Sequence, residues 1–180
     1  MLEHFLHSIR LKVLHLSLKM TAKKRLEKDL QLSDCWQGIY QCVVCWPEEG
    51  VDTAAADIIF RHLRKKFPGA GITVIESLTQ KAYPPEESVR VVSLSKTDFN
   101  FMGFPKSSLK MKLQSINADI AIDLSAKFNP LTAYCCEMCG AKVKVGFALP
   151  DSELVFNFQV LPNSERKGAD RYKVLASYIG

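Results

Sequence analysis

The chain has 180 residues, of which 47% are hydrophobic and 24% charged, and its net charge is +5. A chain of this size can bury roughly 70% of its unfolded surface, so this length and composition exclude disorder and a need for disulfides or metals in folding. No apolar run reaches the roughly 18 residues of a membrane-spanning helix, and the N-terminus lacks the pattern of a signal peptide. We therefore expect a cytoplasmic protein whose six cysteines stay reduced.

The first 34 residues are expected to form a basic, amphipathic helical extension to a single domain at 35–180. Residues 1–30 contain seven Lys or Arg against three Asp or Glu, so they hold most of the net charge. Apolar residues recur there at helical spacing: Phe5, Ile9, Val13, Leu16 and Met20. The pattern predicts a helix that packs on the domain or on a second copy of the chain, as in a homo-oligomer. The alternative is contact with an anionic membrane surface, peripheral to the inner membrane. No nucleic-acid-binding motif is present, so we expect no nucleic-acid partner.

From residue 39 onward, apolar runs of strand length alternate with amphipathic runs of helix length. Strands are predicted at 39–46, 71–76, 89–94, 119–124, 142–147 and 154–160. Helices are predicted at 52–67, 107–116, 129–139 and 168–179. Continuous apolar runs such as 39–46 are typical of parallel strands that are covered on both faces. The alternation predicts an α/β fold with three layers, an open and mostly parallel sheet of about six strands with helices on both faces.

Four of the cysteines form two Cys-x-x-Cys pairs, Cys42 with Cys45 and Cys136 with Cys139. Four such thiolates can ligate zinc, but positions three apart in a strand face opposite sides of its sheet. A redox pair needs a helix N-terminus to lower the thiol pKa, whereas Cys136 and Cys139 fall at the predicted end of a helix. We therefore predict packing roles for these cysteines, and we assign neither a metal site nor a cofactor.

Polar residues follow three of the predicted strands, and in an open α/β sheet ligands bind beyond the carboxyl ends of the strands. The candidate ligand-binding residues are Glu48, Thr53, Lys96, Asp98, Ser125, Lys127 and Asn129. Lysine ammonium groups and the free N–H groups of helix starts favour a small anionic ligand. Neither standard glycine-rich nucleotide motif is present, and Glu48 and Glu49 oppose an anion at the first loop. Solvated loops without a ligand are the alternative.

Three segments carry a resemblance to a known family: Ala118–Ser125, Cys139–Phe147 and Gly168–Leu175. They look like parts of the N-terminal, Rossmann-like domain of heptosyltransferases, the family 9 glycosyltransferases, and the resemblance covers roughly residues 38–180. A closer likeness is to a small family of short bacterial proteins with no assigned activity. Those proteins combine a basic N-terminal helix, a loop like Asp98–Gly103 and a similar Lys-Val-Gly ending.

The resemblance to glycosyltransferases implies a two-domain enzyme that binds its nucleotide-sugar mainly on the second domain, where this chain is expected to end. It also implies a Gly-Asp pair in the first loop whose aspartate acts as a base. Here Val51 separates Gly50 from Asp52, which leaves Asp52 as the one candidate catalytic residue.

We expect a non-catalytic ligand- or partner-binding domain similar to half of a GT-B glycosyltransferase. One alternative is a glycosyltransferase-like enzyme completed by a partner or dimer mate. The other is a hydrolase or phosphotransfer enzyme that uses Glu48, Glu49, Asp52 or Asp98, since paired carboxylates can hold Mg²⁺.

Overall fold

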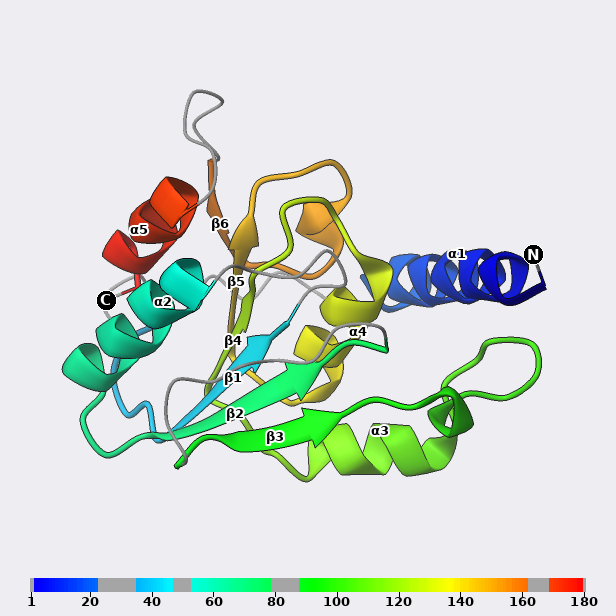
Figure 1. Ribbon diagram of the computed structural model, residues 1–180, viewed down its shortest axis with the longest axis horizontal. Helices are drawn as coiled ribbons and strands as arrows, with labels where there is room; N and C mark the ends of the chain where they lie inside the picture. Colours follow the sequence, from blue (N-terminus) through cyan, green and yellow to red (C-terminus); the bar gives the residue numbers. More distant parts are fainter. Residues whose placement is uncertain (1, 23–34, 47–52, 79–87, 162–168, 180) are drawn as a thin grey trace.

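The computed structural model describes residues 2–22, 35–46, 53–78, 88–161 and 169–179. Within these ranges, six strands form one sheet in the order β3-β2-β1-β4-β5-β6, and every pairing is parallel (Figure 1). The strands are β1 Gln41–Cys45, β2 Gly71–Glu76, β3 Arg90–Ser93, β4 Ile120–Asp123, β5 Val143–Phe147 and β6 Phe158–Val160. The predicted fold class is therefore confirmed.

Helices cover both faces of the sheet and complete the three layers (Figure 1). The α-helices are α1 Leu2–Ala22, α2 Thr53–Lys66, α3 Ser107–Gln114, α4 Pro130–Met138 and α5 Ala169–Ser177, and two short 3-10 helices are η1 Lys96–Asp98 and η2 Ser152–Leu154. Helices α2 and α5 pack on one face, and α1, α3 and α4 lie on the other. Each face of the sheet has its own hydrophobic core: the first core lies under α2 and α5, and the second lies under α1, α3 and α4. Side chains alternate along β1, so Cys42 and Val44 enter the first core whereas Val43 and Cys45 enter the second.

Helix α4 begins and ends as the sequence predicts. Asn129 is its N-cap and accepts a hydrogen bond from the backbone N–H of Leu131 at 2.9 Å. Pro130 occupies the first helical position, where a backbone N–H would have no partner within the helix, so its absence costs no hydrogen bond. Gly140, with a φ of 83°, provides the left-handed residue that ends the helix. These signals fix the start of α4 directly above the carboxyl end of β4.

The N-terminal helix α1 packs on α4, but not through the predicted apolar stripe. Leu14 and Leu18 are buried in the second core, whereas Leu16 is 62% exposed and Met20 is 60% exposed. The helix has two apolar stripes, and periodicity alone does not reveal which of them meets the domain. Packing on the domain is confirmed, and the predicted face is wrong because α4 contacts the opposite stripe.

The sixth strand is shorter than predicted and lies at the sheet edge, next to β5. Ser152–Leu154 form η2, and only Phe158–Val160 pair as β6. Phe156 is buried above β5, where its ring lies over Gly146, so that a Cβ added there would be 2.8 Å from the ring. The apolar run at 154–160 therefore combines a buried turn with a strand.

Candidate functional site

The strand order reverses direction between β1 and β4, which makes this pair the topological switch point of the sheet. The chain proceeds from β1 outward through β2 to β3, and then crosses back to β4 and outward again to β6. Crevices at such a point, outside the carboxyl ends of the strands, are the usual ligand sites of open α/β sheets. Here the edge is formed by Cys45 at the end of β1 and Trp46 after it, by Asp123 at the end of β4, and by the start of α4.

Asp123 is a buried carboxylate at this switch point, and neighbouring residues hold it in place. One oxygen accepts hydrogen bonds from the backbone N–H of Ser125 at 3.0 Å and from the Ser125 hydroxyl at 2.7 Å. The other accepts a bond from the Thr132 hydroxyl at 2.9 Å. The network ties β4 to the first turn of α4. A buried carboxylate without hydrogen bonds is costly, and these bonds offset that cost.

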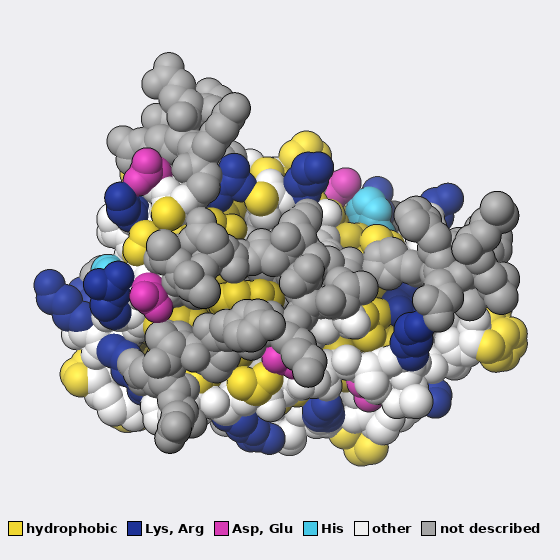
Figure 2. All heavy atoms as spheres, in the orientation of Figure 1, with side chains coloured by type: hydrophobic (Ala, Val, Ile, Leu, Met, Phe, Trp, Pro, Cys, Tyr) yellow, Lys and Arg dark blue, Asp and Glu magenta, His cyan; other side chains and the backbone are white. Residues whose placement is uncertain are grey.

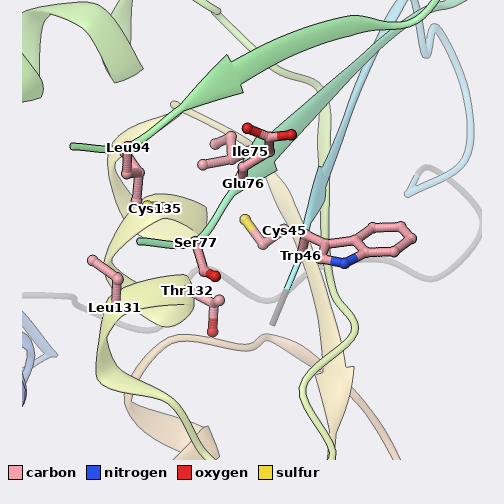
Figure 3. A pocket seen from close by; sticks show the side chains of 9 residues that line it. All are labelled: Cys45, Trp46, Ile75, Glu76, Ser77, Leu94, Leu131, Thr132 and Cys135. Carbon is pink, nitrogen blue, oxygen red and sulfur yellow. The ribbon is translucent and has the colours of Figure 1, made fainter. Parts of the chain in front are cut away.

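Next to this network is a small hollow between the ends of β1 and β2 and helix α4 (Figure 3). The residues that line it are Cys45, Trp46, Ile75, Glu76, Ser77, Leu94, Leu131, Thr132 and Cys135. The hydroxyl groups of Ser77 and Thr132 lie on the same side of it, and the indole of Trp46 points away. It is a shallow depression: its roughly 150 Å³ of empty space includes space open to solvent, and none of it is wide enough to hold a water molecule. A nucleotide-sugar therefore does not fit within this hollow.

The cysteines are buried, unpaired in disulfides and divided between the two cores, which confirms their packing role. Cys45 and Cys136 share a hydrogen bond with 3.4 Å between their sulfurs. That bond and burial raise the pKa of Cys45, and burial likewise raises the pKa of Cys135. Such thiols stay protonated near neutral pH, which makes them poor nucleophiles and poor metal ligands. Among the described residues, no three His, Cys, Asp or Glu side chains are grouped to hold a metal ion.

None of the candidates that the structure describes lines the hollow. Glu48 and Asp52 lie outside the described residues, as does Glu49, and Thr53 is the first residue of α2. Their roles therefore remain predictions.

Two other candidates, Asp98 and Asn129, stabilise local structure. Asp98 in η1 accepts hydrogen bonds from the backbone N–H of Ser95 at 2.7 Å and from the Ser95 hydroxyl at 3.0 Å. Asn129 caps α4, as described above. Ser125 belongs to the Asp123 network. The sequence patterns did not single out Asp123 or Thr132, although an aspartate at the end of an apolar strand run was the signal that could have found the first.

The two candidate lysines, Lys96 and Lys127, are exposed and follow different strands. Lys96 comes after β3 and Lys127 after β4, and β2 and β1 lie between these strands. With about 4.8 Å between neighbouring strands, the two strand ends are about 14 Å apart. The sheet order therefore does not bring these lysines side by side as one anion site.

Comparison with known proteins finds similarity in the fold. No family model matches the chain, and no curated protein matches its sequence. Similar solved structures include the glycosyl transferase family 9 from Veillonella parvula DSM 2008, with a TM-score of 0.53 and 19% identity. Others are E. coli ADP-heptose LPS heptosyltransferase II, with a TM-score of 0.52 and 18% identity, and E. coli heptosyltransferase WaaC with ADP, with a TM-score of 0.53 and 13% identity.

These matches cover 76–78% of this chain but only 40–47% of the glycosyltransferase chains. The chain thus spans less than half the length of the solved structures it resembles. The expected resemblance to a heptosyltransferase domain is confirmed at the level of the fold: this is an α/β domain with a Rossmann-like fold.

Proposed function

We propose that this chain is a non-catalytic binding domain with a glycosyltransferase-like fold, and that the carboxyl edge at β1 and β4 receives its partner or ligand. The observation that carries the proposal is the state of Asp123. This carboxylate occupies the position where an α/β enzyme would place a reactive group, yet three hydrogen bonds from Ser125 and Thr132 direct it into the domain.

The chemistry of the neighbouring hollow also favours binding over catalysis. Its lining includes no histidine, and its cysteines have raised pKa values that keep them protonated. Most of the remaining lining is apolar, with Ser77, Thr132 and Glu76 as its polar side chains. A shallow, mostly apolar depression with a few hydroxyl groups is suited to contact with the surface of a partner.

A small anion is less well suited to the start of α4 than the sequence suggests. Asn129 already satisfies the N–H of Leu131, and Pro130 has no N–H to offer. The Asp123 carboxylate, bonded to Thr132 in the same turn, repels a second negative charge. Among the described residues that follow β1 and β4, Lys127 is exposed and would attract an anion.

A thermal-shift experiment with the full chain tests this proposal. The probes are nucleotide-sugars, nucleoside diphosphates and inorganic phosphate, each added to wild type and to Lys127→Ala. A ligand at 100 times its dissociation constant adds about 2.7 kcal/mol, which raises Tm by roughly 5–10 °C in a domain of this size. We expect no rise with nucleotide-sugars, and we expect any rise with phosphate to require Lys127. A rise with a nucleotide-sugar would favour the glycosyltransferase-like alternative.

The second candidate function is a glycosyltransferase-like enzyme whose other domain comes from a partner or dimer mate. The observation that favours it is the extent of the structural match, which spans 76–78% of this chain and less than half of each glycosyltransferase. A nucleotide-sugar response that strengthens with protein concentration would support the dimer form of this alternative. Asp52→Asn is the variant that tests catalysis in this alternative, because Asp52 is the one residue that the sequence matches to the catalytic base of the family.

A further inference from the structure

Helix α1 presents a second apolar face that no described part of the domain covers. Leu14 and Leu18 contact α4, and Leu16 and Met20 lie on the far side of the helix with more than half of each side chain exposed. Helical geometry places Ile9 and Val13 on that same far side, where both are partly buried. Exposed apolar side chains in a row mark an interaction surface more often than scattered ones do.

The loop between η1 and α3 extends toward the end of the molecule where α1 begins (Figure 1). Phe101 is 88% exposed, and Met102 and Phe104 are exposed as well. The loop is well structured, because the Asn100 side chain accepts hydrogen bonds from the backbone N–H groups of Met102 at 3.0 Å and Phe104 at 2.9 Å. A loop held in this way displays its apolar side chains to solvent as a fixed feature of the fold.

The loop and α1 are in direct contact. Gly103 lies so close to the helix that an added Cβ would be 2.9 Å from the Cα of Arg10. The Arg10 guanidinium stacks over the Phe99 ring, 4.4 Å from its centroid. Hydrophobic side chains are visible on the surface at this end of the molecule in Figure 2. We define the end patch as Leu16, Met20, Phe101, Met102 and Phe104.

The charge around the end patch is positive. Between residues 8 and 21, α1 carries Arg10, Lys12 and Lys19 and no acidic residue. Lys106 is exposed immediately after the loop. Lys19 lies 3.8 Å from Asp151, so one of these charges is partly neutralised. Two copies of the chain that met through this patch would bring like charges together, whereas an anionic surface would be attracted.

We propose that the end patch binds the surface of an anionic lipid bilayer. The apolar side chains of α1 and of the loop enter the headgroup region, and the flanking lysines lie against the lipid phosphates. Among the described residues, no helix is long and apolar enough to cross the bilayer, so the contact is with one leaflet. This inference is independent of the function proposed for the carboxyl edge.

Co-sedimentation of the full chain with vesicles tests the proposal. The vesicles contain phosphatidylcholine with phosphatidylglycerol in equal parts, or phosphatidylcholine alone. We expect binding to the anionic vesicles that weakens with added salt, and weaker binding to the neutral ones. The variants are Leu16→Ser/Met20→Ser in the helix and Phe101→Ser/Met102→Ser in the loop. We expect each pair to weaken binding about tenfold or more.

Tyr178→Ser is the matched control, since Tyr178 is 56% exposed after α5, on the opposite face of the sheet. It is expected to bind as wild type does. Circular dichroism and Tm show whether each variant folds. Because Phe101 is highly exposed, the double substitution in the loop is expected to leave the core intact. The proposal is overturned by absence of binding to anionic vesicles, by binding that neither pair changes, or by a dimer that both pairs dissociate without any change in vesicle binding.

Discussion

The Nζ atom of Lys144 lies 3.0 Å from an Oε atom of Glu137, and both side chains are only 10% exposed. This ion pair joins β5 to α4 on the face of the sheet where α1 also packs. The loss of one partner leaves a buried charge without its counter-ion, so we expect Lys144→Met to lower the free energy of unfolding by about 3–5 kcal/mol.

Urea unfolding of Lys144→Met, Glu137→Leu and the double variant measures this interaction. We expect the double variant to be closer to wild type than either single variant, because an apolar pair of similar size replaces the ion pair without an unpaired charge. Additive losses in the double variant would mean that the two side chains do not interact energetically.

A second prediction concerns the two apolar stripes of α1. We expect Leu14→Ala to destabilise the protein by about 2–5 kcal/mol, since Leu14 is fully buried against the second core. The matched substitution Leu16→Ala, two residues away on the exposed stripe, is expected to change stability by less than about 0.5 kcal/mol. Urea unfolding of both variants provides the comparison, and a larger cost at Leu16 would show that the helix packs through the other face.

The same helix shows what sequence periodicity can and cannot predict. The pattern of Leu16 and Met20 correctly predicted a helix, because any apolar stripe at this spacing favours one. It did not predict which stripe is buried, because α4, more than 100 residues away, supplies the contact. By contrast, the α4 boundaries were predicted correctly because Asn129, Pro130 and Gly140 act through local backbone geometry.

A third prediction follows from the buried thiols. Burial raises the pKa of Cys42 and Cys139 from 9.0 to about 12. Above pH 9 the unfolded chain loses these protons while the folded chain keeps them, so stability falls as pH rises from about 9 to 12. Each thiol contributes a slope of up to about 1.4 kcal/mol per pH unit.

Urea midpoints measured from neutral pH to about pH 11 follow this loss, and Cys42→Ala is expected to have a shallower slope than wild type. The rate of labelling by a thiol reagent provides a second measurement, since all six cysteines should react rapidly in the unfolded chain and slowly in the folded one. A midpoint that does not change above pH 9, or rapid labelling of the native protein, would be evidence against buried thiols.

A fourth prediction isolates the contact between the loop and α1. Gly103 and Gly140 have nearly the same positive φ, 84° and 83°. A Cβ at Gly140 would meet no atom within 4 Å, whereas a Cβ at Gly103 would be 2.9 Å from the backbone of Arg10. Gly140→Ala should therefore cost the backbone strain alone, about 1–2 kcal/mol. We expect Gly103→Ala to cost more, and equal costs measured by urea unfolding would show that the loop does not touch α1.

The candidate site was only partly predictable, for a physical reason. The sequence correctly located Ser125 and Asn129 near the carboxyl end of β4, because strand ends and caps are local features. It did not reveal the role of Asp123, since the hydroxyl of Thr132 completes that site from another element. Lys96 and Lys127 were grouped by residue type, and only the strand order shows how far apart their strands are.

Release of a nucleoside diphosphate from nucleotide-sugars by the purified chain alone tests the central claim, that the carboxyl edge of this domain binds without catalysing a reaction. We predict no release above the background rate at any protein concentration, for wild type and for Asp52→Asn alike. Release by wild type that Asp52→Asn abolishes would contradict the claim and assign the domain to an active glycosyltransferase.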